Sequence, residues 1–221
     1  PVPLPGAHLS LDELDARYYH RSEEGILCLI AGKIGNLGPG AGCDGPVAKI
    51  ARDFRLYQTG EQPVTLVDFK AGFEDLARGS VTSLDWAMVV VDPTTAAIQM
   101  AVHMRDMVAK IQAGGLPATK HLETTELVAW ANRIFSRATI REVLVVLNRV
   151  ADGNMERVMR AKLAANDLEP IGVIPADPAI ALAWLEGKPL TGTTIREELE
   201  TIVDNLATVA AEQRLTVQPV R

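Results

Sequence analysis

The stretch Trp86-Ala-Met-Val-Val-Val-Asp-Pro-Thr94 decides the fold class of this 221-residue chain. Its apolar run has the length and composition of a β-strand buried on both faces, and the proline after it ends the strand. Thr94 or Thr95 then caps a helix whose apolar residues recur at helical spacing as far as Ile111, before Gly114-Gly115 ends it. A buried strand followed directly by such a helix is the repeating unit of a parallel α/β sheet.

The same alternation of strands and helices runs outward from this unit in both directions. Further strands are expected at 26–30, 64–67, 143–148 and 171–174, and further helices at about 10–19, 46–54, 121–137, 154–165, 178–185 and 194–212. Strands that alternate with helices imply a parallel sheet with helices on both faces. We therefore expect a single three-layer α/β domain over residues 1–221.

Composition and charge narrow the classes of function. The chain is 48% hydrophobic, with a net charge of −6 and a pI of about 5.3. Nucleic acids and anionic membranes are bound by clustered lysine and arginine, so neither is expected as a partner. No apolar run approaches the ~20 residues that span a bilayer, and the start Pro1-Val-Pro-Leu-Pro5 lacks the features of a signal peptide. The sequence therefore predicts a cytoplasmic protein.

The run Val64-Thr-Leu-Val-Asp68 is expected to be a buried strand that delivers one carboxylate to its C-terminal end, with Gly72 four residues later. In nucleotide-hydrolysing α/β proteins this spacing puts an acid beside Mg²⁺ and a flexible backbone beside the γ-phosphate. The alternative is a strand-end acid that bonds nearby backbone. The sequence contains no glycine-rich loop ending in Gly-Lys-Ser or Gly-Lys-Thr, which would hold the phosphates.

Two further polar segments follow expected strands. Asn148-Arg149 follows a five-residue apolar run, and an Asn amide there can serve both the donor and the acceptor of an adenine edge. The segment Ile174-Pro-Ala-Asp177 can shape a pocket for a base. Both segments are also compatible with ordinary strand-end turns, so the residues alone leave the two interpretations open.

The glycine-rich segment 32–45 contains Gly40-Ala-Gly-Cys-Asp-Gly45, which formally matches the dinucleotide-binding pattern G-x-G-x-x-G. The expected strand before it ends near Ala31, whereas this fingerprint needs a tight strand-to-helix turn. The spacing therefore disfavours an NAD site. Of the two cysteines, which make no disulfide framework, Cys28 is interpreted as a small buried hydrophobic residue in a strand and Cys43 as a thiol in a loop.

The order of these motifs is more specific than any one of them. The chain carries, in sequence, V-D-F-K-A-G-F-E-D-L-A-R-G (67–79), V-V-V-D-P-T (89–94), V-L-N-R-V (146–150) and G-V-I-P-A-D-P-A-I-A-L-A-W-L-E-G-K-P-L (172–190). This order resembles the MinD/ParA class of deviant P-loop ATPases. Within that class it is most similar to CooC-like accessory ATPases, which serve nickel insertion into carbon monoxide dehydrogenase. The resemblance covers roughly residues 25–110 and 140–190.

The resemblance implies a P-loop-NTPase-like fold and a site for ATP or ADP with Mg²⁺, held between the subunits of a homodimer. It gives roles to six residues: Asp68 as the acid beside Mg²⁺, Gly72 as the switch glycine, Asn148 with Arg149 at the adenine, and Pro175 with Asp177 in the segment that closes over the base. It further implies nickel delivery to a client metalloenzyme similar to carbon monoxide dehydrogenase. Residues 1–24 then form an N-terminal extension and 116–140 a helical insertion.

The chain also departs from the family pattern. The opening strand, the K-G-G-V-G-K-T-T loop and the helix after it are missing, and Asp75 replaces a histidine. The Cys-x-Cys of CooC-like chains, whose thiolates two subunits can share around nickel or zinc, is reduced to Cys43 with Gly45 in the second position. We expect no ATP hydrolysis by this chain alone. The alternative is a non-enzymatic interaction module, which dimerises or pairs with a separate P-loop chain.

Overall fold

The computed structural model describes residues 8–29, 55–57, 59, 64–69, 79–118, 124–190 and 195–216. The chain divides into two compact units. The first unit comprises Pro1–Asp85 and Lys110–Ile140, and the second comprises Trp86–Ala109 and Arg141–Arg221. Each unit is described by itself below.

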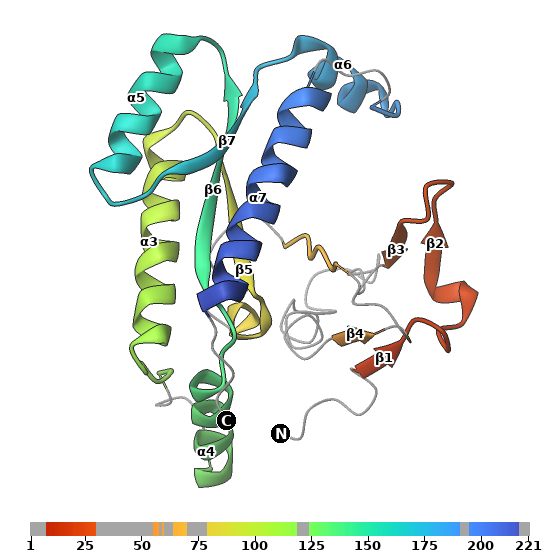
Figure 1. Ribbon diagram of the computed structural model, residues 1–221, viewed down its shortest axis with the longest axis vertical. Coiled ribbons are helices and arrows are strands. Elements are labelled where there is room, and N and C mark those ends of the chain that lie inside the picture. The colour runs from red at the N-terminus through yellow and green to blue at the C-terminus, as the bar shows by residue number, and fades with distance from the viewer. Residues whose placement is uncertain are drawn as a thin grey trace, which may run out of the picture. The chain divides into compact units, whose positions relative to one another are not determined.

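A parallel three-stranded sheet forms the centre of the second unit. Its strands are β5 (Trp86–Val91), β6 (Glu142–Val150) and β7 (Pro170–Pro175), hydrogen-bonded in the order β5-β6-β7 with both pairings parallel (Figure 1). All three segments were expected as strands. The central strand β6 is buried along most of its length, as is typical of a parallel sheet that helices cover. The prediction of an α/β fold with a parallel sheet is confirmed.

Helices connect and cover these strands. They are α3 (Thr95–Gln112), α5 (Gly153–Ala164), α6 (Pro178–Glu186) and α7 (Arg196–Thr216). On β7, Val173 packs against the core that α3 and α5 share, whereas Gly172 meets Ile202 of α7. Successive residues of a strand point to opposite faces, so α7 covers the face opposite to that of α3 and α5. The predicted helices on both faces of the sheet are confirmed.

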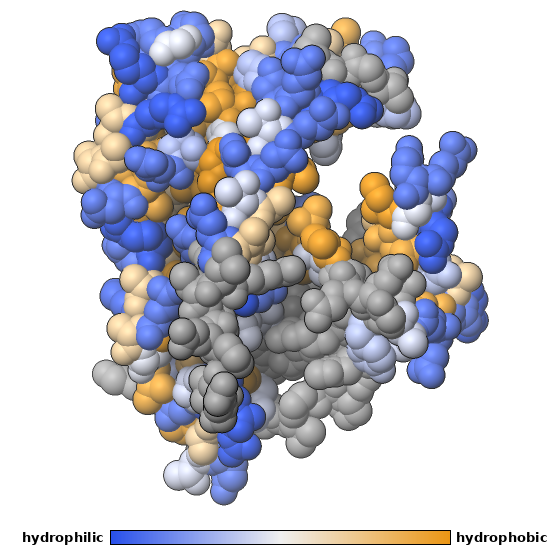
Figure 2. Space-filling model, viewed as in Figure 1, coloured by the Kyte–Doolittle hydropathy of each residue, from blue (hydrophilic) through white to orange (hydrophobic). Residues whose placement is uncertain are grey.

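The core of the second unit is aliphatic and lies between the sheet and two helices. Its buried members come from β5, β6, α3, α5 and the loop before β7: Val91, Ile98, Ala101, Val145, Leu147, Val150, Met159, Leu163 and Leu168. Hydrophilic side chains cover the outer surfaces of α5 and α7, with hydrophobic ones in the seam between them (Figure 2). Because these side chains are closely packed, the core holds the ends of the strands in fixed positions.

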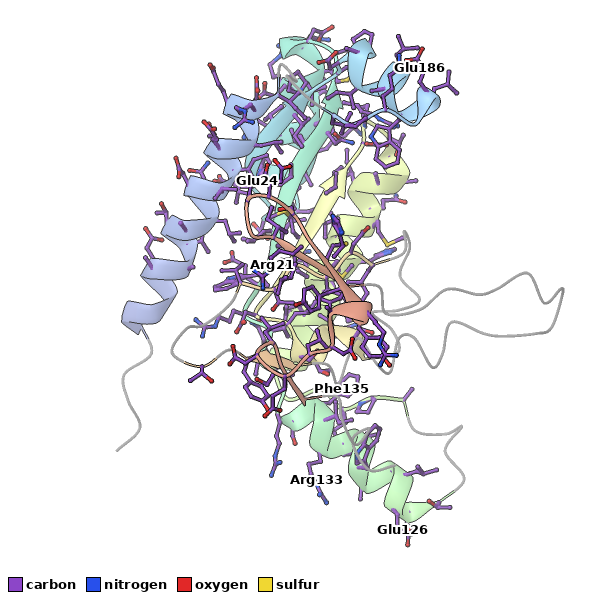
Figure 3. All side chains as sticks on the ribbon, turned by 90° about the vertical axis from the view of Figure 1, so that its right-hand side faces the viewer. Arg21, Glu24, Glu126, Arg133, Phe135 and Glu186 are labelled. Carbon is purple, nitrogen blue, oxygen red and sulfur yellow. The ribbon has the colours of Figure 1, made fainter. Side chains whose placement is uncertain are left out.

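The described residues of the first unit form two short strand pairs and one longer helix. Strand β1 (His8–Ser10) pairs in parallel with β4 (Arg55–Tyr57), and β2 (Tyr19–Arg21) pairs antiparallel with β3 (Leu27–Leu29). Glu24 lies at the turn between β2 and β3 (Figure 3).

The helix of the first unit is α4 (Thr125–Ser136), which confirms the helix expected at about 121–137. Thr124 is its N-cap, since its Oγ1 accepts a hydrogen bond from the Leu127 N–H at 3.2 Å. Glu126 and Arg133 are exposed on it (Figure 3). None of the helices in the described ranges has the length and apolarity needed to cross a membrane.

The prediction of a helix at 10–19 was wrong. Ser10 ends β1, and its Oγ accepts from the Asp12 N–H two residues on at 3.3 Å, which is the pattern of a local turn. Leu11 donates its N–H to the Tyr57 carbonyl at 2.9 Å, so the backbone here continues the pairing with β4. Only a single 3₁₀ turn forms, η1 (Ala16–Tyr18), with Asp15 as its N-cap. Strand pairing therefore competed successfully with the capping-box signal.

The prediction of a buried strand at 64–67 was also wrong. Residues 64–69 have no regular secondary structure, and Val64 and Leu66 are 89% and 85% exposed. A strand is stable only when its N–H and C=O groups are paired, and no strand in the described ranges pairs with this segment. The strand expected at 26–30 exists as β3 but is only half-buried, and Cys28 on it is exposed and free rather than buried. The helix expected at 46–54 lies outside the described residues.

Candidate functional site

Polar residues meet at one edge of the sheet in the second unit. Because β5, β6 and β7 are parallel, their C-terminal ends lie at the same edge, which we call the carboxyl edge. It is formed by Asp92 directly after β5, by Asn148 and Arg149 near the end of β6, and by Pro175 and Asp177 at the end of β7 and just after it. Ligands of open α/β sheets bind outside this edge.

Asn148 is held by a carboxylate of the neighbouring strand. Its Nδ2 donates a hydrogen bond to Oδ1 of Asp92 at 2.8 Å, and the contact is partly buried. Hydrogen bonds to an ionised acceptor are stronger than those between neutral groups. The contact therefore fixes the amide of Asn148 at the end of the central strand.

Arg149 reaches the other oxygen of the same carboxylate. One of its guanidinium nitrogens lies 3.4 Å from Oδ2 of Asp92, and its side chain is 72% exposed. An ion pair this exposed contributes less than about 1 kcal/mol to stability. The ion pair therefore adds little stability, and its main effect is to position the Arg149 guanidinium at the carboxyl edge.

The backbone of Arg149 is in an uncommon conformation, with φ at 55°. A left-handed conformation costs a non-glycine residue roughly 1–2 kcal/mol. Consecutive strand residues point to opposite faces, so Asn148 and Arg149 in a regular strand would not both reach one carboxylate. The register with β7 shifts between Leu147 and Val150, so one extra residue is inserted in β6 at this place. This bulge brings the two donors together on Asp92.

Three helices begin at the carboxyl edge, and each has a side-chain cap. Thr94 Oγ1 accepts from the Ala97 N–H of α3 at 3.1 Å, and Asp152 Oδ1 accepts from the Met155 N–H of α5 at 2.8 Å. Asp177 Oδ1 accepts from the Ala179 N–H of α6 at 2.8 Å. Each of these bonds satisfies one of the N–H groups that a helix start leaves without a partner within the helix.

The cap gives Asp177 a structural role, which sequence analysis did not anticipate. Replacing an N-cap acid by alanine costs typically about 1 kcal/mol, so we expect Asp177→Ala to lower the free energy of unfolding by about that amount. Asp177→Asn keeps an oxygen at the cap and should stay within a few tenths of a kcal/mol of the wild type. Urea denaturation followed by circular dichroism measures both variants. Equal stability of Asp177→Ala and the wild type would refute the cap.

The other predicted site residues lie elsewhere or outside the described residues. Asp68 belongs to the first unit, where its side chain is exposed and its segment has no regular secondary structure. Gly72 and Cys43 are outside the described residues. At the end of the same motif, Gly79 has φ at 91°, a conformation that suits glycine, and begins the 3₁₀ turn η2 (Ser80–Ser83). The roles given to Asp68, Gly72 and Cys43 stay predictions.

A metal centre is not found in the part of the chain that the structure describes. No group of three or more His, Cys, Asp or Glu side chains there is arranged to hold a metal ion. Sequence analysis gave Asp92 no role in holding Asn148. Its position after an apolar strand was visible in the sequence, but its contact with Asn148 depends on the pairing of β5 with β6.

Comparison with known proteins gives distant structural similarity. The chain is similar to MinD cell division protein of Aquifex aeolicus, at 17% identity and a TM-score of 0.37, over 69% of this chain and 51% of that one. It is also similar to a chain of the MinC:MinD cell division protein complex of Aquifex aeolicus, at 13% identity and a TM-score of 0.43, over 93% of this chain and 70% of that one. The chain thus spans about half the length of the first of these structures.

No protein-family model matches the chain, and no curated protein does. The fold class, an α/β fold with a parallel sheet between helices, rests on the strand pairing of the second unit.

Proposed function

We propose that this chain binds an adenine nucleotide at the carboxyl edge, with Asn148 contacting the base. The observation that supports this most is the hydrogen bond of 2.8 Å by which Asp92 holds the Asn148 amide at the end of the central strand. An amide fixed at that place has hydrogen-bonding capacity left for a ligand, because an Asn side chain has two N–H donors and a carbonyl acceptor. The bond to Asp92 uses only one of the donors.

The neighbouring residues have complementary roles in this proposal. Arg149 is largely exposed and its guanidinium can stack on a base or bind a phosphate. Pro175 at the end of β7 and Asp177 at the start of α6 would lie beside the base. Asp68 would bind Mg²⁺ and Gly72 would adjoin the γ-phosphate, as their motif suggests. Without a Gly-Lys-Thr loop to stabilise the transition-state charge, the chain binds ATP or ADP but does not hydrolyse ATP alone.

The wider role that we propose is that of a CooC-like accessory protein in the maturation of a nickel centre. Its support is the order of sequence motifs, from the aspartate-glycine run at 67–79 to the proline-aspartate segment at 172–190. In this role the protein acts in the cytoplasm as a homodimer and serves a metalloenzyme client similar to carbon monoxide dehydrogenase. Cys43 from each subunit would contribute to a nickel or zinc site at the dimer interface.

A second candidate function is that of an interaction module that pairs with a separate P-loop chain. Within the described ranges, β5 is an edge strand of the three-stranded sheet. Two apolar side chains on one of its faces, Met88 and Val90, are 41% and 56% exposed. An edge strand with exposed apolar residues is able to add a strand from another chain.

Calorimetric titration of the purified protein with Mg²⁺-ATP and Mg²⁺-ADP tests the proposal. We expect saturable binding by the wild type and a loss of about tenfold or more in affinity for Asn148→Ala, since that change removes the groups that contact the base. Asn166→Ala is the matched control, because Asn166 follows α5 at the opposite edge of the sheet.

Two outcomes count against nucleotide binding at this edge. One is the absence of any heat of binding at millimolar nucleotide, and the other is an equal effect of Asn148→Ala and Asn166→Ala. Formation of a stable complex with a P-loop ATPase subunit, by a chain that binds no nucleotide itself, would favour the interaction module.

A further inference from the structure

We propose that Asp92 makes the site select adenine over guanine, because it fixes the orientation of the Asn148 amide. This inference rests on the nucleotide binding proposed above and goes further, since it names the residue that determines the choice between the two purine bases. Asp92 is a positioning residue here: it acts on the ligand through Asn148.

The first step is the direction of the hydrogen bond between the two side chains. A carboxylate only accepts hydrogen bonds, so the group of Asn148 that lies 2.8 Å from Oδ1 of Asp92 is its NH₂ and not its carbonyl. The carbonyl oxygen lies on the other branch of the planar amide. Asp92 thereby sets which end of the amide turns toward it and which end is left for a ligand.

The second step is that both carboxylate oxygens of Asp92 have protein donors. Oδ1 accepts from Asn148, and Oδ2 lies 3.4 Å from the guanidinium of Arg149. The left-handed backbone at Arg149 and the register shift beside it are what bring the second donor into reach. Strain of this kind persists only where the surrounding structure imposes it. The two contacts therefore fix the orientation of the carboxylate that holds Asn148.

The third step compares the two purines. Adenine presents an amino donor at N6 beside a ring acceptor, whereas guanine presents two adjacent acceptors at O6 and N7. An amide whose carbonyl oxygen and second N–H remain for the ligand complements the adenine pair. The same amide would set its carbonyl oxygen against O6 of guanine, where two acceptors face each other without a proton.

The decisive variant is Asp92→Asn, which keeps the size of the side chain but can donate as well as accept. With Asn at position 92 the amide of Asn148 can adopt either orientation, and selectivity should be lost. We expect the wild type to bind Mg²⁺-ATP about tenfold or more tighter than Mg²⁺-GTP, and the ratio to fall toward one in Asp92→Asn. The titrations are done by calorimetry on the full chain.

The matched control is Asp152→Asn. Asp152 also lies at the carboxyl edge, but it caps α5, and an asparagine caps a helix as well as an aspartate does. The same chemical change there should leave the ATP to GTP ratio within about twofold of the wild type. Thermal unfolding of both variants reports whether either one is misfolded.

A second measurement reports the orientation without any nucleotide. In a ¹H–¹⁵N spectrum, the Asn148 side-chain amide should show one proton shifted and slowed in exchange by its bond to Asp92. This signature should be weaker in Asp92→Asn, where the Asn148 amide can adopt either orientation, and unchanged in Asp152→Asn. A wild-type spectrum without it would overturn the inference.

The outcomes separate this inference from the proposed function. If the wild type binds neither nucleotide, the proposed nucleotide binding is refuted, and the inference about selectivity is refuted with it. If the wild type binds both nucleotides equally, or if Asp92→Asn keeps the wild-type ratio, nucleotide binding stands and only the role of Asp92 is overturned. A reduced ratio in Asp92→Asn together with an unchanged ratio in Asp152→Asn supports the inference.

Discussion

Leu147→Ala is expected to lower the free energy of unfolding by about 3–4 kcal/mol, within the range for buried leucines. Leu147 is 0% exposed and lies on β6 between its two neighbouring strands. It belongs to the core that the sheet shares with α3 and α5. Because neighbouring strands and helices fix the walls around it, the truncated side chain leaves a cavity that cannot readily collapse.

The matched control is Leu185→Ala on α6, where the leucine is 84% exposed. Removing the same atoms there should change the stability by no more than about 0.5 kcal/mol. Urea denaturation followed by far-ultraviolet circular dichroism measures both variants. Comparable losses from the two would mean that Leu147 does not occupy a closed core, and would place the sheet of the second unit in doubt.

The C-terminal half of the chain was predictable because its signals are local and agree with one another. The run Trp86–Val91 is apolar throughout, Thr94 caps the helix that follows, and β6 repeats the pattern at Glu142–Val150. Each strand pairs with the next one along the chain, so no distant segment has to be identified to complete the sheet. Propensity, periodicity and pairing all favour one fold here.

The N-terminal half was less predictable because its strands depend on partners. The residues Val64 to Val67 have strand propensity, yet so short a segment becomes a strand only if neighbours satisfy its backbone groups. Ser10 carries a capping-box pattern, but it lies in β1, whose partner β4 begins 45 positions later, at Arg55. A sequence pattern does not reveal a pairing at that separation.

For the candidate site, the sequence placed Asn148 and Arg149 after an apolar strand but could not show how they are held. Their common contact with Asp92 needs the β5–β6 pairing and the extra residue that the register with β7 inserts near Arg149. A left-handed arginine is not predicted by propensity, since glycine and asparagine are the residues expected there. The arrangement of the three side chains is therefore a property of the folded sheet.

Gly172→Ala is expected to lower the free energy of unfolding by about 3 kcal/mol, at the upper end of the range for overpacked positions. A Cβ at residue 172 would lie 2.2 Å from Cγ1 of Ile202 and 3.0 Å from its Cδ1. Ile202 is 6% exposed on α7, so its side chain has little room to move away. The glycine is needed because α7 packs directly on the backbone of β7.

Two further variants separate this clash from a general effect of alanine. Gly153→Ala makes the same change at the first residue of α5, where a Cβ would meet nothing within 4 Å, and should leave the stability equal or raised by up to about 1 kcal/mol. In Gly172→Ala/Ile202→Ala the shortened side chain makes room for the new methyl. The double variant should therefore lose less than the sum of the two single losses, by about 1–2 kcal/mol. Strict additivity of the two losses would show that the close approach of α7 to Gly172 is not what makes alanine costly there.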